Sequence, residues 1–296
     1  MASPIEVLTK INLDDLVSSF GFENARLPAA IVRRIFTRPA RKFAGQMIEY
    51  DVLVGRVGLR RASREILQKY YIKDLCVHGQ DNIPASGPVL FLSNHPGMGD
   101  TISLFAAIPR DDLRIIAIHR PFLVSLPNIS KYLSYMSEDS GERMRAVRQI
   151  TSHLRTGGSA LTFPAGKIEP DPDVHTGALE ALKDWMHSSG IFMRFVPDLQ
   201  IVPVLVSGVI WKRAARHWLT RFKRSREDRE KLAASLQLLA MVVRDARPTI
   251  VNIRFGKPIT RNDVNPKDLS CVHEKLTERM SCLLEQENKS KEISHS

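Results

Sequence analysis

One histidine and one aspartate are spaced so that they can act together in proton transfer. His95 and Asp100 flank a short segment that contains one proline and two glycines, Pro96, Gly97 and Gly99. A tight turn there lets the Asp100 carboxylate fold back and accept a hydrogen bond from Nδ1 of the imidazole. Such a bond fixes the tautomer, leaves Nε2 as a general base and stabilises the imidazolium that forms.

The nucleophile that completes a Ser-His-Asp triad is missing from the sequence. The chain has no Gly-x-Ser-x-Gly segment and no reactive cysteine motif in its place. We therefore expect the pair to activate a hydroxyl that belongs to the substrate. In the alternative interpretation, Asp100 only caps the helix that it precedes, and His95 is a loop histidine that happens to be near.

Short apolar runs alternate with helical patterns over most of the chain after residue 88. The runs predict strands at 89–92, 114–118, 159–163, 200–206 and 250–255, and the patterns predict helices at 101–107, 142–154, 177–187 and 228–244. This alternation predicts an α/β fold with a mixed, largely parallel sheet flanked by helices. His95 follows the first strand, at the edge of the sheet where such folds bind ligands.

Five blocks in this order resemble the PlsC-like glycerolipid acyltransferase family. The first consists of Asn94, His95 and Asp100, which resemble the family's H-x4-D motif at the end of a strand. The other four are 161–166, which includes Pro164 and Gly166, then 176–178, then 201–204, which includes Pro203, and 251–259. The resemblance covers about residues 75–284, and the blocks occur in the same order as in the family.

The resemblance implies transfer of an acyl group from a thioester to oxygen. His95 would take the proton from an acceptor hydroxyl, which attacks the thioester of acyl-CoA or acyl carrier protein, while Asp100 orients His95. Neither a metal nor a cofactor is implied, because the acyl donor is a co-substrate. Backbone N–H groups of the 97–99 turn or of the Gly166 turn are the candidate donors to the oxyanion.

The residues that hold the acceptor's phosphate in the family are altered in this chain. Ala165 occupies the position of the third motif's glutamate, Ile168 that of its arginine, and the stretch 134–139 lacks the second motif's arginine. The cations that we expect to replace them are Arg120, Lys167 and Arg143, with Gly166 as a further acceptor-binding residue. Glu169 is expected to act as a partner of Lys167 or as a ligand of the acceptor hydroxyl.

Because this phosphate clamp is altered, three functions stay open. The first is acyl transfer to a lysolipid or a glycerol phosphate. The second is transfer to an acceptor without the glycerophosphate, such as a lyso-aminolipid or another lysolipid. The third is a non-catalytic protein that binds a lipid or an acyl carrier on the same fold. For Arg143, exposure to water on a helix is the alternative to acceptor binding.

The charge of the chain points to an anionic partner. Lys and Arg number 43 against 32 Asp and Glu, which gives a formal net charge of +11. A positive field suits an anionic membrane surface, an acidic carrier protein or a phosphorylated substrate. We expect no nucleic acid partner, because no zinc finger, RNP or helix-turn-helix pattern accompanies the charge.

The segment 211–231 predicts a basic amphipathic helix that lies in a membrane interface. Trp211, Trp218 and Phe222 fall on one stripe at helical spacing, and lysines and arginines flank this stripe. The alternative is that both tryptophans are buried in the core and the basic residues form a solvated face.

Composition and pattern divide the chain into three parts. We expect a helical N-terminal segment over 1–74, an acyltransferase domain over 75–284 with the basic insertion at 211–231, and a flexible tail over 285–296. Three widely spaced cysteines indicate neither a disulfide framework nor a zinc site, which suits a reducing compartment. No signal peptide or apolar stretch of about 20 residues is visible, so we expect a cytoplasmic protein that is peripheral on the membrane.

Overall fold

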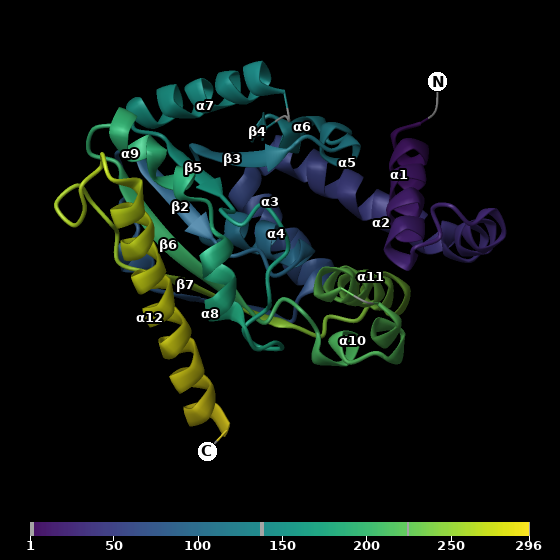
Figure 1. Cartoon of the computed structure of the whole chain (residues 1–296). Helices are drawn as coiled ribbons and strands as arrows, with labels where there is room; N and C mark the ends of the chain where they lie inside the picture. The colour runs from purple at the N-terminus through teal and green to yellow at the C-terminus, as the bar shows by residue number, and fades with distance from the viewer. Residues whose placement is uncertain (1–2, 137–138, 224, 296) are drawn as a thin grey trace.

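The computed structural model describes residues 3–136, 139–223 and 225–295. Within this part of the chain, seven strands form one sheet in the order β1-β7-β6-β2-β5-β3-β4 (Figure 1). The strands are β1 (Asp74–His78), β2 (Val89–Ser93), β3 (Leu113–Ile118), β4 (Leu133–Met136), β5 (Ser159–Thr162), β6 (Gln200–Ser207) and β7 (Ile250–Phe255). All neighbouring strands are parallel except β6 and β7, which are antiparallel. The predicted mixed, largely parallel α/β class is therefore confirmed.

The five predicted strands are present, and two further strands were missed. Both missed strands, β1 and β4, lie at the edges of the sheet. Their residues are mostly half-buried or exposed, whereas every residue of β2 is buried. A strand at the edge of a sheet is less completely covered by helices than a central strand. Its sequence therefore lacks the continuous apolar run of a strand that is buried on both faces.

The central strand β2 sends alternate side chains into two separate cores. Val89 and Phe91 belong to one hydrophobic cluster, and Leu90 and Leu92 belong to the other. This follows from the two-residue period of a strand, and it requires helices on both faces of the sheet. The sheet is thus covered on both sides, and the loops at its edges are the parts open to ligands.

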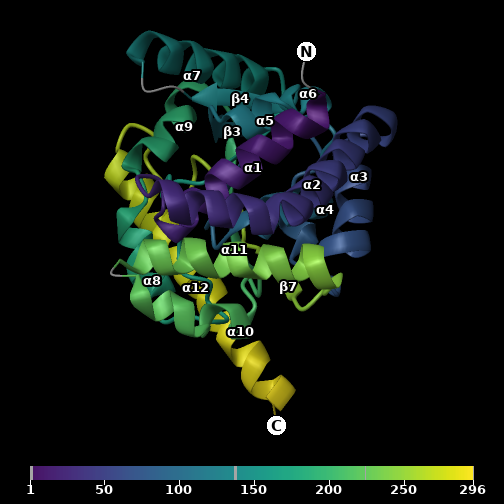
Figure 2. The ribbon, with the colours of Figure 1, turned by 90° about the vertical axis from the view of Figure 1, so that its right-hand side faces the viewer.

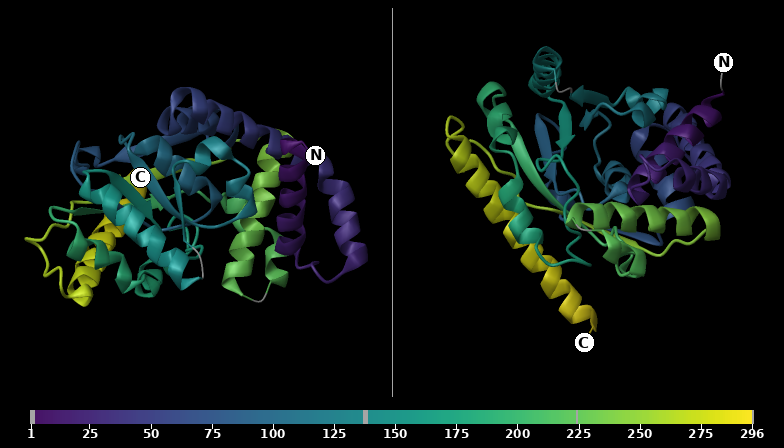
Figure 3. Two further views of the ribbon diagram at one scale, coloured as in Figure 1. Left: turned by 90° about the horizontal axis from the view of Figure 1, so that it is seen from above. Right: turned by 45° about the vertical axis from the view of Figure 1, so that its right-hand side comes forward.

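Helices cover both faces of this sheet. The longer helices are α1 (Pro4–Phe20), α2 (Arg26–Val57), α3 (Leu59–Ile66), α4 (Met98–Ala107), α7 (Ser140–Arg155), α11 (Arg226–Arg244) and α12 (Leu269–His295). The short ones are α5 (Pro121–Val124), α6 (Pro127–Ser130), α8 (Ala178–Ala181), α9 (Phe192–Phe195), α10 (Lys212–Ala215) and η5 (Trp218–Phe222). Residues of α2, α3 and α4 pack in the core of one face, and residues of α7 and α12 in the core of the other. Figures 2 and 3 show α1, α2 and α11 side by side.

The N-terminal helices share a core with the sheet. Met47, Tyr50 and Ile66 belong to the same cluster as Phe91 of β2. The buried Asp51 carboxylate in α2 accepts hydrogen bonds from the backbone N–H groups at the start of α6. Residues 1–74 were predicted as a helical segment, and the described part of them packs directly on the strands rather than apart from them. Among the described residues, no helix is both long and apolar enough to cross a membrane.

The tail that was predicted to be flexible is helical in the structure. Helix α12 continues to His295, and Glu287 in this stretch is only 2% exposed. The Glu287 carboxylate accepts hydrogen bonds from Ser207 Oγ at 2.7 Å and from Arg254 Nε at 2.6 Å. The polar composition of this stretch misled the prediction, because one of its charges is buried against β6 and β7. Ser296 lies outside the described residues.

Truncating Glu287 to alanine is expected to lower the free energy of unfolding by about 1.5–3 kcal/mol, because it removes the charged hydrogen bond to the partly buried Arg254 guanidinium. Urea denaturation of the variant measures this loss. Glu285→Ala on the exposed side of the same helix is the matched control and is expected to change stability by less than about 0.5 kcal/mol. Equal stability of the two variants would show that the buried ion pair does not hold α12.

The segment 211–231 is not the single helix that was predicted. It forms α10, the short 3-10 helix η5 and the start of α11, and non-helical residues such as 217 and 223 separate them. Ala214 is buried, but Trp218 is 61% and Phe222 75% exposed. The exposure excludes the alternative in which both tryptophans are core. Arg224 of this segment lies outside the described residues.

Candidate active site

The predicted hydrogen bond between the histidine and the aspartate is present. His95 follows β2, and its Nδ1 lies 2.7 Å from Oδ2 of Asp100. The His95 side chain is 28% exposed and that of Asp100 is fully buried. The imidazole also stacks on the ring of Phe163, with 4.5 Å between the ring centroids. The carboxylate and the aromatic ring together fix the orientation of the imidazole, with Nε2 turned away from Asp100.

Asp100 caps α4 from inside the helix rather than from the N-cap position. Gly97 is the N-cap residue, and Asp100 Oδ2 accepts a hydrogen bond from the Gly97 N–H at 3.0 Å. Its other oxygen, Oδ1, accepts from Thr101 Oγ1 at 2.9 Å. Asp100 therefore both caps the start of α4 and bonds His95, because one oxygen serves both bonds, and the alternative in which it only caps the helix is wrong.

The electrostatic surroundings of His95 favour its protonated form. Burial alone lowers the pKa of His95, but the charge and the hydrogen bond of Asp100 raise it, and Glu169 adds to this rise. The positive charge of Arg120 acts in the opposite direction, and the net shift is upward. A raised pKa strengthens the imidazole as a base, and it also moves the onset of the neutral form, which can accept a proton, to higher pH.

Glu169 holds the main chain of His95. Its Oε2 accepts the His95 N–H at 3.0 Å, and its own N–H donates to the His95 carbonyl at 2.8 Å. Its Oε1 accepts from Trp185 Nε1 at 2.6 Å, and the residue is 3% exposed. Both carboxylate oxygens of Glu169 thus accept hydrogen bonds from inside the protein, a role that was not predicted from the sequence. Its expected role as a partner of Lys167 or as a ligand of the acceptor hydroxyl stays a prediction. The sequence signal for the contact between Glu169 and the His95 main chain was an acidic residue three positions after the block 161–166.

The residues that support the motifs lie at the same edge of the sheet. Asn94 joins β2 to β6, because its side chain donates to the Val206 carbonyl at 2.9 Å and accepts the Val206 N–H at 2.8 Å. Pro203 is buried in β6 opposite Leu92 of β2. Pro164 is also buried, and its carbonyl accepts the N–H of Met186. These contacts fix the ends of the strands on which the site is built.

The Gly166 turn and the 97–99 turn each use a glycine N–H for a hydrogen bond inside the protein. Gly166 has φ of +64°, a conformation that favours glycine. Its N–H donates to the carbonyl of Phe163, and the N–H of Gly97 donates to Asp100. Both of these N–H groups are thus engaged within the protein.

Only one of the three predicted cations is brought to the His95 pair. Arg120 follows β3 at the same edge of the sheet, is exposed, and acts electrostatically on both His95 and Asp15 of α1. Lys167 instead forms an exposed ion pair with Asp184, at 2.9 Å. Arg143 is exposed in the first turn of α7, beyond the edge strand β4. In the second-motif stretch, residues 137 and 138 lie outside the described residues.

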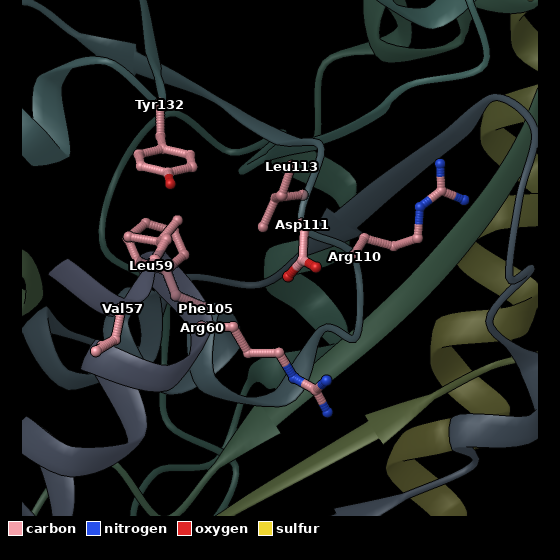
Figure 4. Close-up of a pocket in the computed structure, with 9 residues that line it drawn as sticks. Val57, Leu59, Arg60, Phe105, Arg110, Asp111, Leu113 and Tyr132 are labelled. Atoms are coloured by element: carbon pink, nitrogen blue, oxygen red, sulfur yellow. The ribbon is translucent and has the colours of Figure 1, made fainter. Parts of the chain in front are cut away.

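A hollow of about 250 Å³ lies near the amino end of β3, whereas His95 follows the carboxyl end of β2 (Figure 4). Its lining residues are Val57, Gly58, Leu59, Arg60, Phe105, Arg110, Asp111, Leu113 and Tyr132. Leu113 begins β3, whereas His95 comes after the end of the parallel strand β2, so the hollow and the His95 pair are separated by the length of the strands.

Comparison with known proteins gives the class of the chain. Residues 74–207 match the family model described as Acyltransferase. This segment contains His95, Asp100 and Glu169 together with the strands β1 to β6. Residues 74–207 are therefore similar to the acyltransferase family, and this domain supports an acyltransferase enzyme. The resemblance drawn from the sequence blocks is thereby confirmed.

The comparison with solved structures yields five matching chains. One is the crystal structure of the 1-acyl-sn-glycerophosphate (LPA) acyltransferase PlsC from Thermotoga maritima. Its sequence identity with this chain is 15%, the match covers 93% of this chain and 97% of that one, and the TM-score is 0.43. No curated protein matches the chain significantly.

Proposed function

We propose that the protein is a glycerolipid O-acyltransferase. It moves a fatty acyl group from acyl-CoA or acyl carrier protein to a hydroxyl of a lysolipid or a glycerol phosphate. The observation that carries this proposal is the 2.7 Å bond between His95 Nδ1 and Asp100 Oδ2, inside a segment that matches the acyltransferase family. Such a pair can deprotonate a hydroxyl without any protein nucleophile.

The reaction follows from the orientation of the imidazole. Nε2 of His95 takes the proton of the acceptor hydroxyl as its oxygen attacks the thioester carbonyl carbon. The Asp100 carboxylate stabilises the imidazolium. When the tetrahedral intermediate collapses, the C–S bond breaks, the new C–O ester bond remains, and the imidazolium returns its proton to the leaving thiolate. The protein contributes orientation, proton transfer and electrostatic stabilisation.

Arg120 supports an acceptor that carries a phosphate. It is exposed at the same edge of the sheet, and its charge acts on His95. A single arginine supplies a bidentate pair of donors to a phosphate. Lys167 is drawn to Asp184 and Arg143 lies on the outer helix, so the acceptor's anionic group is proposed to rest mainly on Arg120.

Thiol release tests this function directly. Purified protein is given acyl-CoA or acyl carrier protein together with glycerol 3-phosphate, lysophosphatidic acid, or lysolipids that lack a free phosphate. Turnover on the phosphate-bearing acceptors supports the proposal. Turnover only on a lyso-aminolipid or another lysolipid would favour the altered specificity, and no turnover with any acceptor would favour the non-catalytic binding protein.

We propose that a basic and apolar surface, formed by η5 and the start of α2, holds the protein on an anionic membrane. Trp218 and Phe222 of η5 are 61% and 75% exposed, and Leu27 and Ile31 at the start of α2 are 79% and 58% exposed. The two segments are neighbours, because the Lys223 ammonium lies over Gly21, where a Cβ would meet it at 3.1 Å. Exposed aromatic and aliphatic side chains beside cations suit an anionic lipid surface.

Replacing Trp218 and Phe222 together with serine is expected to weaken binding to vesicles that contain phosphatidylglycerol at least tenfold, because burial of each large apolar side chain contributes about 1.5–3 kcal/mol. Vesicle co-sedimentation measures the change. Val243→Ser, at an equally exposed position of α11, is the control and is expected to bind like the unchanged protein. Unchanged binding of the folded double variant would exclude η5 as the membrane contact.

A further inference from the structure

Glu169 forms two hydrogen bonds with the main chain of His95. The carboxylate accepts the His95 N–H, and the Glu169 N–H donates to the His95 carbonyl, so both backbone groups of His95 are held by one residue. Asp100 holds the imidazole ring but makes no contact with these backbone groups in the described structure. The ring and the main chain of His95 are thus fixed by two different acids.

The other end of Glu169 is anchored in the core. Its Oε1 accepts from the indole N–H of Trp185 at 2.6 Å. Trp185 is 2% exposed and packs with residues of α7 and α12 on the far face of the sheet. Glu169 therefore links the backbone of His95 to a rigid, fully buried side chain. A group held in this way moves little when a substrate binds.

The neighbouring acid strengthens this link. Asp171 is 1% exposed, and its carboxylate accepts the backbone N–H groups of Gly208 and Ile210 at 2.9 and 2.8 Å. Ile210 in turn packs against Gly97, where a Cβ would come within 3.0 Å of its side chain. The segment 169–171 thus supports the turn after β2 from two sides, directly at His95 and through Ile210 at Gly97.

We propose that Glu169 is a positioning residue for acyl transfer, which holds the main chain of His95 so that Nε2 faces the acceptor hydroxyl. This inference rests on the proposed function. Misplacing a reacting group by about 1 Å can cost about 10²-fold in rate, and the backbone of His95 sets the height of Nε2 above the edge of the sheet.

The charge of Glu169 acts on the same imidazole. Burial raises the pKa of Glu169 to about 7, against the hydrogen bonds from Trp185 and from the His95 N–H, while the charge of Asp100 raises it further. Conversely, the negative charge of Glu169 raises the pKa of His95, and Arg120 opposes that effect. The groups that face Glu169 are therefore His95, Asp100 and Trp185, and their titrations are coupled.

Glu169→Gln tests the inference with little change in shape. The amide can accept only one of the two N–H groups, because its NH₂ opposes the other. We expect kcat to fall about 10–100-fold while KM for donor and acceptor changes less than about threefold. Glu180→Gln, the same change at an exposed position of α8, is the matched control and is expected to leave kcat unchanged.

A measurement without substrates separates this inference from the proposed function. NMR titration of the His95 imidazole in Glu169→Gln is expected to give a lower pKa than in the unchanged protein, because a neighbouring negative charge is removed. An unchanged pKa together with an unchanged kcat would overturn the inference and leave the proposed function standing. If no acyl transfer is found at all, the imidazole titration still decides whether Glu169 acts on His95.

A second measurement covers the case in which Glu169→Gln does not fold. In the unchanged protein, the indole N–H resonance of Trp185 is expected to shift with an inflection near the Glu169 pKa of about 7. Trp185→Phe identifies the resonance. This N–H is also expected to be protected from exchange with solvent, because it is bonded to the buried Glu169 carboxylate. A Trp185 indole N–H that exchanges with solvent as fast as an unprotected one would show that Glu169 is not held to the core, and would overturn the inference.

Discussion

Alanine in place of His95 is expected to reduce acyl transfer by about 10²–10⁴-fold, because the His95 imidazole is the proposed base that deprotonates the acceptor hydroxyl. KM for the acyl donor is expected to stay within about threefold, since thioester binding does not depend on this proton transfer. Thiol release from acyl-CoA and acyl carrier protein measures both quantities. The loss should appear with every acceptor that the unchanged protein accepts.

The control for this substitution is His78→Ala, at an exposed position at the end of β1. It is expected to leave acyl transfer unchanged. Binding of His95→Ala to anionic vesicles is also expected to be unchanged, because Trp218 and Phe222 are intact. Acyl transfer by His95→Ala at more than about a third of the normal rate would show that another group is the base and would remove the basis of the proposed mechanism.

Asparagine in place of Asp100 is expected to lower kcat by about 10³–10⁴-fold, although the two side chains have nearly the same shape. Oδ2 accepts from both Nδ1 of His95 and the N–H of Gly97, and an amide NH₂ at that position can accept from neither. If the amide oxygen takes that position instead, the stabilising charge for the imidazolium is still lost. The wrong tautomer and the missing charge both reduce proton transfer.

The pH dependence gives Asp100→Asn a second, independent signature. Burial lowers the pKa of His95, and Asp100 raises it by its charge and hydrogen bond, so removing the charge lowers this pKa. Because the neutral imidazole is the active form, the acid limb of kcat/KM should move to lower pH even as the maximum falls. Asp111→Asn, on the exposed turn before β3, is expected to change neither quantity. An acid limb that moves to higher pH would contradict the assignment of Asp100.

The sequence predicted the central part of the fold because that part is buried on both sides. β2 and β6 consist of nearly continuous apolar residues, and such runs occur where two layers of helices cover a strand. The turn after β2 was predictable for a related reason. His95 and Asp100 are near in sequence, so the spacing alone brings their side chains within reach of each other.

The parts that were missed depend on contacts between residues far apart in sequence. Glu169 is 74 positions from His95, and neither its burial nor its bond to Trp185 has a local pattern. Glu287 of α12 is likewise buried through its bonds to Arg254 of β7 and Ser207 of β6, which lie far from it in the sequence. The segment 211–231 has helical periodicity, but its tertiary contacts, such as the bond from the Trp211 N–H to Gln237, divide it into shorter elements.

The two hydrogen bonds between Asn94 and Val206 have a consequence for how this protein can diversify. They continue the pairing of β2 and β6 up to the residue before His95. His95, the proposed base, therefore follows directly on central strands, which are the elements of a fold that resist local unfolding most. Arg120, by contrast, stands on the rim, beside the short helix α5 and opposite α1. If Arg120 holds the acceptor as proposed, substitutions that change the preferred acceptor are expected around Arg120, where they cost little stability, and not at the proposed base His95.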